Sequence, residues 1–406
     1  MRPGNDHVFQ FTLPGISGDM ALRNLSYREK RMGLSLREKL KSAGTVQKKH
    51  PAPVSDGECL VRREERSAGE MGLPPVLSGQ TLRVMQGQEF ADFGRESLLF
   101  LDTETTGLSG GAGTVAFLVG VGYFEGDIYR LEQYLMRDYN EEASVIARTA
   151  EKIRDHPILC TFNGVTFDMP LLRSRAVMQR TRLPAERGHI DLLHTARRVW
   201  RMRLKKCNLK NIEEQILGLT REDDLPGALV PETYFRFLRT RDMSLLEGIL
   251  EHNAQDIGSL PVLLGLLMKI HSDPLTLDRS EDLYSMGRVH ERRGMNEEAR
   301  KCYRAAGQKG LVFLSRIRMA EIARREGNYS ESAELYESAL RKRQSADVHI
   351  ALSKIYEHRL RDLPRAMEHA SRAMMLTDPS DRDAEDALMK RMRRLRGKMD
   401  RTGGNG

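Results

Sequence analysis

The order of the predicted strands between residues 97 and 180 sets the strongest limit on how this chain folds. Three apolar runs rich in β-branched and aromatic residues predict β-strands, at residues 97–104, 114–124 and 128–136. The short turn "EGD" joins the second and third runs as a hairpin. A helical pattern over residues 140–156 then leads to a fourth strand at 157–163. Three hairpin-linked strands, a helix and another strand predict a layered α/β sheet.

The segments on either side of this sheet have different patterns. Residues 1–92 predict a basic N-terminal helix followed by a flexible linker, because Pro, Gly and charged residues dominate the later part. Residues 93–272 contain the strand and helix patterns of the α/β domain. Residues 278–400 contain helical periodicity without strand signals, which predicts an all-α domain.

Charge and cysteine content narrow the class of protein. The net charge of +8 suggests a polyanionic partner such as nucleic acid, although many basic proteins bind none. The four cysteines form no C-x-x-C pair, which favours reduced thiols over a disulfide framework or a zinc site. The first residues lack the apolar centre of a secretory signal, and the longest apolar run is too short to span a bilayer. We therefore expect a cytoplasmic protein without a membrane span.

Two carboxylates stand at the end of the first predicted strand, in the sequence "LLFLDTE". Asp102 and Glu104 are two residues apart, so both side chains lie on one face of an extended strand. Carboxylates this close repel each other, and a divalent cation such as Mg²⁺ or Mn²⁺ removes the repulsion by accepting oxygen ligands. Acids at strand ends are common, so this pair needs further acids to define a site.

Two further pairs of polar residues are candidates for the same site. One pair follows the fourth predicted strand, and the other lies on a late apolar helix. Asn163 ends the fourth strand and Asp168 opens the next helix, at an edge where function concentrates in α/β folds. A turn residue and a helix cap are their alternative roles. His252 and Asp256 are four residues apart on a long apolar helix, so they share one helix face. Either that face borders a functional site, or the two side chains form a structural His–Asp pair and satisfy each other. Pro261 is expected to kink or interrupt that helix.

These segments together resemble a known family. "LDTETTGL", "TFNGVTFDMPLL" and "EHNAQDIGSL" contain acids in an order similar to that of the DEDD superfamily of 3′–5′ exonucleases. With "HIDLLHTARRVW" and "DDLPGALVPETYFRFL", they look like the YprB-type ribonuclease H-like domain, over residues 90–270. The resemblance implies an α/β ribonuclease H-like fold, in which a mixed sheet is flanked by helices.

The resemblance also implies roles for individual residues. Two divalent metal ions, Mg²⁺ or Mn²⁺, would be held by the carboxylates of Asp102, Glu104, Asp168 and Asp256. His252 would act as the general base, and Thr105 and Asn163 would contact the substrate. One feature departs from the superfamily. A catalytic His there stands five residues before the last Asp and a catalytic Tyr four before, whereas His252 stands at the Tyr spacing.

The C-terminal helices resemble tetratricopeptide repeats. Small and aromatic residues recur after 33 residues, at Gly287, Gly294, Ala299, Tyr303 and Ala306, and then at Ala320, Gly327, Tyr336 and Ala339. A weaker third copy follows at residues 351–374, and a basic helix would cap the array. Stacked helix pairs bury faces that one pair leaves exposed. The resemblance implies a protein partner, while unrelated amphipathic helices are the alternative.

A basic stretch follows the fourth strand of the α/β domain. Residues 197–210 include seven Lys or Arg around the single Trp of the chain. Backbone phosphates are natural partners for such a stretch, and contacts are expected from Arg201, Arg203 and Lys205. A solvated surface is the alternative. For Trp200, packing is favoured over stacking on a base.

Together these features predict a divalent-metal-dependent 3′–5′ exonuclease that hydrolyses phosphodiesters by a two-metal mechanism. Its substrate would be DNA or RNA, entering as a single-stranded 3′ end, and the helical repeats would bind a protein partner. A non-catalytic nucleic-acid adaptor and a tetratricopeptide scaffold are the alternatives. Four intact acids favour the enzyme, because a binding module gains nothing from negative charge where phosphate must approach.

Overall fold

The computed structural model describes residues 57–107, 113–221 and 226–403. The chain divides into a unit of Met1–Ser42 and a unit of Ala43–Gly406. The predicted basic N-terminal helix lies outside the described residues.

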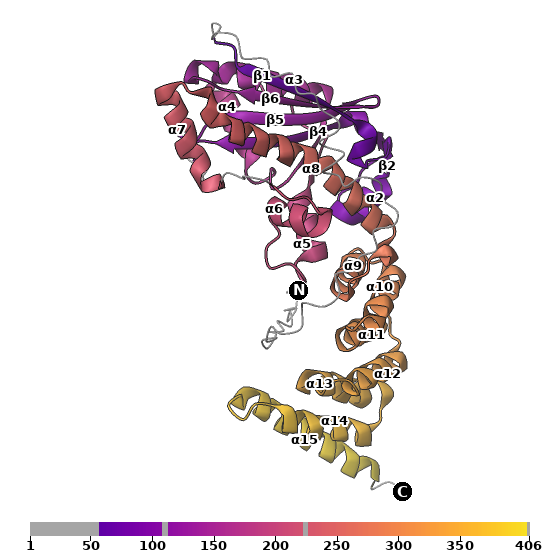
Figure 1. Ribbon diagram of the computed structural model, residues 1–406. Helices are drawn as coiled ribbons and strands as arrows, with labels where there is room; N and C mark the ends of the chain where they lie inside the picture. Colours follow the sequence, from indigo (N-terminus) through magenta and orange to yellow (C-terminus); the bar gives the residue numbers. More distant parts are fainter. Residues whose placement is uncertain (1–56, 108–112, 222–225, 404–406) are drawn as a thin grey trace. The chain divides into compact units, whose positions relative to one another are not determined.

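A six-stranded mixed sheet forms the centre of the α/β part (Figure 1). Its strands are β1 (Leu60–Ser67), β4 (Leu98–Thr105), β5 (Ala116–Glu125), β6 (Ile128–Leu135), β7 (Ile158–Thr161) and β8 (Gly188–Asp191). Their order is β1-β6-β5-β4-β7-β8. β1, β6, β5 and β4 pair antiparallel, while β7 and β8 continue parallel from β4. A separate two-stranded sheet pairs β2 (Val76–Leu77) with β3 (Phe93–Gly94). The predicted meander, helix and further strand are confirmed.

Helices cover both faces of this sheet. Those of the α/β part are α2 (Gly79–Gln86), α3 (Glu142–Asp155), α4 (Asp168–Met178), α5 (Leu192–Trp200), α6 (Leu209–Ile212), α7 (Val230–Thr240) and α8 (Glu247–Ser272). Side chains alternate along β4, so Leu98 and Phe100 join one apolar core while Leu99 and Leu101 join the other. Residues of α2, α5 and most of α8 fill the first core; residues of α3, α4 and α7 fill the second. This sandwich fits the predicted mixed sheet flanked by helices.

The prediction of a flexible linker up to residue 92 is wrong for its described part. Leu60–Ser67 forms β1, which pairs with β6 along its whole length. Alternate residues of β1 are exposed, and most of its side chains are charged. Because edge strands commonly have polar side chains, the composition resembled that of a linker. α2 lies in the same segment and packs against α8.

α8 crosses β4, β5 and β6 closely because two glycines of β5 face it (Figure 1). A Cβ at Gly120 would lie 2.2 Å from Asn253 Oδ1, and one at Gly122 would lie 2.8 Å from the Ile257 side chain. Asn253 and Ile257 are one turn apart on one face of α8, and Gly120 and Gly122 lie on one face of β5. The two spacings match, so each glycine faces one of the two helix residues. Strand glycines of this kind mark close approach of another element.

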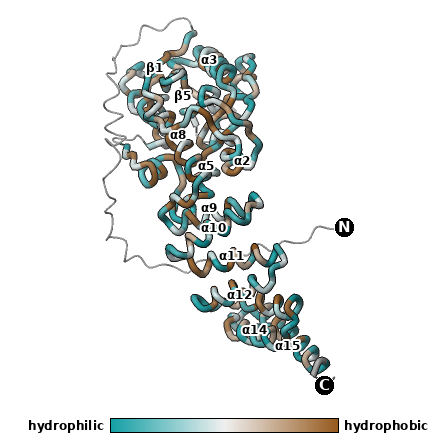
Figure 2. The backbone as a smooth tube through the Cα atoms, turned by 90° about the vertical axis from the view of Figure 1, so that its right-hand side faces the viewer, coloured by the Kyte–Doolittle hydropathy of each residue, from teal (hydrophilic) through white to brown (hydrophobic). Residues whose placement is uncertain are grey.

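α8 continues through Pro261 to Ser272, so the expected interruption is wrong. Proline has no N–H for the carbonyl four residues earlier, which here belongs to Ile257. The hydroxyl of Tyr129 donates to that carbonyl at 2.8 Å. The freed backbone acceptor is therefore satisfied from the sheet. From Ile257 onward the helix is mostly apolar and largely buried (Figure 2).

From residue 280 to 403 the described chain is all-helical. Its α-helices are α9 (Ser280–Arg292), α10 (Asn296–Gln308), α11 (Val312–Arg325), α12 (Tyr329–Leu340), α13 (Ala346–Ile355), α14 (Leu363–Leu376) and α15 (Arg382–Gly403). Neighbouring helices pack in pairs, and a Cβ at Gly287 would lie 2.5 Å from the ring of Tyr303. The all-α prediction is confirmed. That these pairs are tetratricopeptide repeats stays a prediction.

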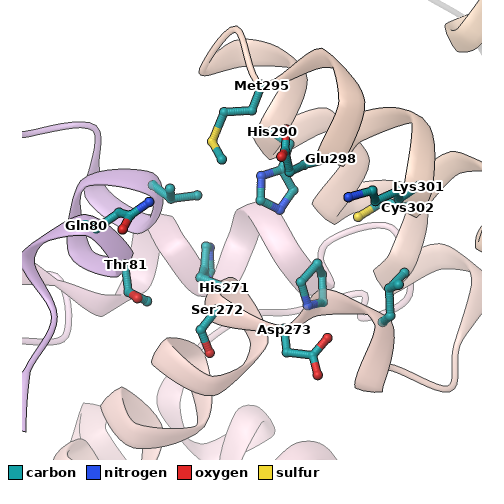
Figure 3. A pocket seen from close by; sticks show the side chains of 13 residues that line it. Gln80, Thr81, His271, Ser272, Asp273, His290, Met295, Glu298, Lys301 and Cys302 are labelled. Carbon is teal, nitrogen blue, oxygen red and sulfur yellow. The ribbon is translucent and has the colours of Figure 1, made fainter.

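The sheet part and the helical part share one apolar core. Met286 and Val289 of α9 and Cys302 of α10 belong to the cluster that contains Trp200 and the end of α8. A cavity of about 400 Å³ lies at this junction, with His271 on the α8 side and His290 and Cys302 on the α9–α10 side (Figure 3).

Two further predictions concern thiols and membranes. All four cysteines are buried and free, as expected. In the part of the chain that the structure describes, no helix combines the length and the apolar character needed to cross a bilayer.

Candidate active site

Four carboxylates from three elements meet where β4 ends. Asp102 and Glu104 lie on β4, Asp168 is the first residue of α4, and Asp256 lies on α8. They are close enough that Asp168 and Asp256 raise the pKa of both β4 acids. The four residues predicted as metal ligands are therefore brought together. Their proposed role as ligands is a separate step, taken below.

Asp102 is held by a hydrogen-bonded row that crosses three strands. Asp102, Gly120 and Gln133 are register partners on β4, β5 and β6. Because Gly120 has no side chain, Asn253 of α8 occupies the space above it. The Asn253 amide donates to Asp102 Oδ2 at 3.0 Å and its carbonyl accepts from Gln133 at 2.9 Å. Burial and the nearby carboxylates, Asp256 foremost, hold the pKa of Asp102 well above its usual value.

Asp168 is buried at the N-terminus of α4. The Thr103 hydroxyl donates to its Oδ1 at 2.5 Å, which joins α4 to β4 between the other two acids. Burial raises the pKa of Asp168 to about 6, although the Thr103 hydrogen bond acts in the opposite direction. Asp168 stands at the first helical position rather than at the cap, which is Phe167. A plain capping role therefore does not account for it.

His252 lies between two of the acids. Its Nε2 is 3.9 Å from Glu104 Oε1 and 3.6 Å from Asp256 Oδ2. Burial raises the pKa of Glu104 to about 7, against the lowering influence of His252. The shared helix face of His252 and Asp256 is confirmed, and it borders the acid cluster.

Arg221 is a charged residue at this site that the sequence did not indicate. Its guanidinium donates to Asp256 Oδ1, lies 2.8 Å from His252 Nδ1, and donates from Nε to Glu213 Oε2 at 2.7 Å. Glu213 is fully buried in the short π-helical segment Glu213–Leu217 and also accepts the Ser259 hydroxyl at 2.5 Å. Arg221 stands in the polar run "LTRED". No sequence pattern there distinguishes an arginine that is buried from one that is exposed to solvent.

A divalent ion at this site would need several oxygen donors arranged around one point. Within residues 57–107, 113–221 and 226–403, no three His, Cys, Asp or Glu side chains are placed to hold a metal ion as they stand. Protein donors engage Asp102, Asp168 and Asp256 instead. The chemistry of the set fits a hard cation, because it offers only carboxylate oxygens and burial makes their shared negative charge unfavourable.

The residues predicted to contact substrate lie in different settings. Asn163 has φ 75°, and its N–H donates to Asp191 Oδ1 at 3.0 Å. Asp191 also accepts from Val165 and caps α5, so it fixes the loop that leads to Asp168. Thr105 is buried and donates to the Gly107 carbonyl. The glycine-rich residues 108–112 lie outside the described chain.

The predicted basic contacts divide in the structure. Arg201 and Lys205 are exposed. Arg203 forms an ion pair with the buried Asp282 of α9 at 2.8 Å, so its guanidinium joins the two parts of the chain. Trp200 is 1% exposed within the shared core, which confirms packing over base stacking.

Comparison with known proteins identifies the family. A family model described as the RNase_H superfamily matches residues 99–268. The uncharacterized protein YprB of Bacillus subtilis (strain 168) is 30% identical over 290 residues, which is 70% of this chain and 70% of that protein. The chain belongs to the YprB family. The matched residues contain β5 to β8, nearly all of β4 and most of α8, and all four clustered acids lie within them.

A solved structure is also similar to the YprB-family chain. It is the family B DNA polymerase from the hyperthermophilic archaeon Pyrobaculum calidifontis, with 16% identity and a TM-score of 0.33. The match covers 49% of this chain and 29% of the polymerase chain. The superfamily assignment itself supports a nuclease domain acting on nucleic acid with divalent metal ions.

Proposed function

We propose that this YprB-family protein is a divalent-metal-dependent 3′–5′ exonuclease of the DEDD type. The observation that carries the proposal is the convergence of Asp102, Glu104, Asp168 and Asp256 from three separate elements into a buried cluster. A stable fold gains nothing from gathering four acids, since each raises the cost of ionising the others. A function that uses their combined charge accounts for the arrangement.

The four carboxylates would hold two divalent ions, Mg²⁺ or Mn²⁺. Such ions supply a bound water of lowered pKa and stabilise the negative charge of the leaving 3′ oxygen. Asn253 and Thr103 orient Asp102 and Asp168 before any ion binds. Arg221 donates to Asp256 Oδ1, so its guanidinium would have to give up this contact for that oxygen to hold an ion.

His252 is proposed as the group that accepts the proton of the attacking water. It lies beside Glu104 and Asp256, as a general base next to the metal ligands would. Asn163 and Thr105 are proposed to contact the substrate from the ends of β7 and β4. The substrate would be a single-stranded 3′ end of DNA or RNA, whose phosphates the exposed Arg201 and Lys205 would also contact. Arg203 is removed from this set by its ion pair with Asp282.

The division of the chain is part of the same proposal. Residues 93–272 would be the exonuclease domain, extended at its N-terminal side by β1 and α2. Residues 278–400 would be tetratricopeptide repeats that bind a protein partner, supported by the packing of Gly287 against Tyr303. The four free thiols are compatible with a reducing, cytoplasmic compartment.

The test is cleavage of labelled oligonucleotides by the full-length protein. Single- and double-stranded DNA and RNA, labelled at either end, are incubated with Mn²⁺ or with EDTA. We expect stepwise shortening from the 3′ end with Mn²⁺ only. Asp168→Asn should abolish it, whereas the exposed Asp347→Asn should not. Binding without shortening of any substrate would favour the adaptor alternative.

A further inference from the structure

A groove of about 520 Å³ lies between α5 of the nuclease domain and α9, the first helix of the C-terminal array. Five arginines line it: Arg197, Arg198, Arg201, Arg288 and Arg292. Among the described residues that line it, none is Asp or Glu. This concentration of one charge is unlike the mixed ion pairs found elsewhere on the described helices.

The arginines follow the helical repeat on both sides of the groove. Arg197 and Arg201 are four residues apart at the end of α5, and Arg288 and Arg292 are four apart on α9. Residues at this spacing share a helix face. Two arginine-bearing faces, nearly 90 residues apart in sequence, therefore meet across one groove.

Two carboxylates of α9, the helix on one side of the groove, already have other partners. Asp282 of α9 pairs with Arg203, and Glu291 pairs with Arg318 and Arg325. Neither acid is left to neutralise the groove. The side chains of Arg197, Arg201, Arg288 and Arg292 make no hydrogen bond or ion pair with the described residues. Arg198 donates one N–H to the Met85 carbonyl, and burial lowers its pKa together with the charges of Arg293 and Arg292.

Like charges held at this density repel, and an anion with several regularly spaced charges relieves the repulsion. Arginine forks match phosphate oxygens geometrically. Tyr284, half-buried beside Tyr303, adds an aromatic side chain to the lining, and aromatic side chains also take part in single-strand binding. These features together fit a phosphodiester backbone better than a single small anion.

We propose that the α5–α9 groove binds the backbone of the nucleic acid whose end enters the acid cluster. The first C-terminal helix is then a nucleic-acid-binding element, in addition to any role in protein binding. The proposal rests on the proposed function in taking the anion to be the substrate strand.

The length of α5 sets how much of a nucleic-acid strand is needed to span from the acid cluster to the groove. Its cap, Asp191, fixes the loop beside Asp168, and its other end bears Arg201. A helix rises about 1.5 Å per residue, so Arg201 lies roughly 15 Å from that cap along the axis. At about 3.4 Å per nucleotide of a stacked strand, this distance corresponds to roughly four nucleotides. A strand shorter than this would not reach from the acids into the groove.

Binding without catalysis tests the groove separately from the acids. Full-length protein in EDTA is titrated with a fluorescent 20-nucleotide single strand at several salt concentrations. The test variant changes Arg197, Arg288 and Arg292, three arginines of the groove outside the proposed active site, to Ser. The control changes Arg304, Arg341 and Lys342 to Ser, which are exposed basic residues elsewhere in the array. Both lose three charges.

We expect the groove variant to bind the 20-mer about tenfold more weakly than the wild type. Its slope of log affinity against log salt should flatten by up to about 2, because each lost phosphate contact removes about 0.7 from the slope. The control should change neither strongly. Equal effects of the two variants would overturn the proposal. A competition experiment provides a second such outcome. If polyglutamate displaces the 20-mer as well as an unlabelled strand of equal charge does, the groove suits an acidic protein and the proposal is overturned.

A second measurement separates failure of the groove from failure of the nuclease. With Mn²⁺, the groove variant should raise KM for the 20-mer but not for a trinucleotide, while kcat stays near that of the wild type. An equal rise in KM for both lengths would contradict the path. If the wild type cleaves nothing but the groove variant still loses binding in EDTA, the nuclease proposal fails and the groove stands as a binding site.

Discussion

Asp102 and Glu104 show how single residues at this site depend on their surroundings. Neither acid is fully exposed, and burial is the main cause of the raised pKa of each. Asn253 offsets part of this for Asp102 by donating a hydrogen bond, and His252 offsets part of it for Glu104. The clustered carboxylates therefore favour the binding of a proton or a cation, either of which reduces their mutual repulsion.

Replacing Glu104 should change how stability depends on pH. Burial raises the pKa of Glu104 to about 7, above the ordinary glutamate value of about 4.3. The folded chain thus retains a proton that the unfolded chain releases between these values. The stability that Glu104 contributes is complete below pH of about 4.3 and is lost as the pH rises through about 7. In EDTA, the wild type should lose more stability between pH 5 and 8 than Glu104→Gln. Denaturant unfolding across this range measures it, and parallel pH curves would refute the shift.

His252 offers a kinetic prediction at the same scale. If it is the general base, His252→Ala should lower kcat by roughly 10²–10⁴. The stabilisation of the folded chain by Mn²⁺ should be largely kept, because the four carboxylates remain. His252→Tyr should retain more activity than the alanine variant, since Tyr is the residue type that the superfamily uses at this spacing. Wild-type turnover in His252→Ala would show that the base lies elsewhere.

At the scale of elements, α8 and β5 define where the site can be. Gly120 and Gly122 let the helix lie close to the sheet, and Tyr129 allows it to continue through Pro261. Strands β4 to β7, α8 and the four acids were predictable, because periodicity and motif spacing are local properties. Asn253 could have been inferred from its place three residues before Asp256, facing a strand with two glycines. Arg221 could not have been inferred in this way. Its contact with Glu213 depends on the π-helical conformation of Glu213–Leu217, which the sequence does not predict.

Gly120→Ala tests this close approach. The added Cβ would lie 2.2 Å from Asn253 Oδ1, so α8 or the asparagine must move. We expect a loss of about 1–3 kcal/mol in the free energy of unfolding, as for other overpacked positions. Nuclease activity should fall as well, since Asp102 loses its donor.

The matched control for Gly120→Ala is Gly248→Ala on α8. Its Cβ would meet nothing within 4 Å. Alanine is favoured over glycine in a helix by up to about 1 kcal/mol, so this variant should be neutral or stabilised. Equal effects of the two substitutions would show that the close approach has no energetic consequence.

At the scale of the whole molecule, the described sheet part and helical array are joined by a common core and by the Arg203–Asp282 ion pair. The sequence predicted an α/β domain and an all-α domain, but not this junction, because contacts between distant segments leave no periodic signal. It also concealed β1, since a charged edge strand has the composition of a linker. The ion pair explains why Arg203 behaves differently from its basic neighbours.

Met286→Ala probes whether the two parts unfold together. Met286 lies on α9 but is fully buried in the core that holds Trp200, the single tryptophan of the chain. Deleting its side chain should cost about 2–5 kcal/mol and lower the denaturant midpoint that Trp200 fluorescence reports. Met319→Ala, in a separate cluster further along the array, should affect that midpoint less. An unchanged tryptophan transition in Met286→Ala would mean that the core is not shared.

The most direct test of the central claim is the thermal stability of the full-length protein with and without Mn²⁺. If the four clustered acids hold divalent ions, saturating Mn²⁺ should raise the Tm of the wild type by several degrees, since it binds only the folded state. Asp102→Asn should be more stable than the wild type in EDTA, because one repelling charge is gone, and should lose most of the response to Mn²⁺. Asp347→Asn should respond as the wild type does. The claim is contradicted if Asp102→Asn retains the full rise, or if the wild type shows none.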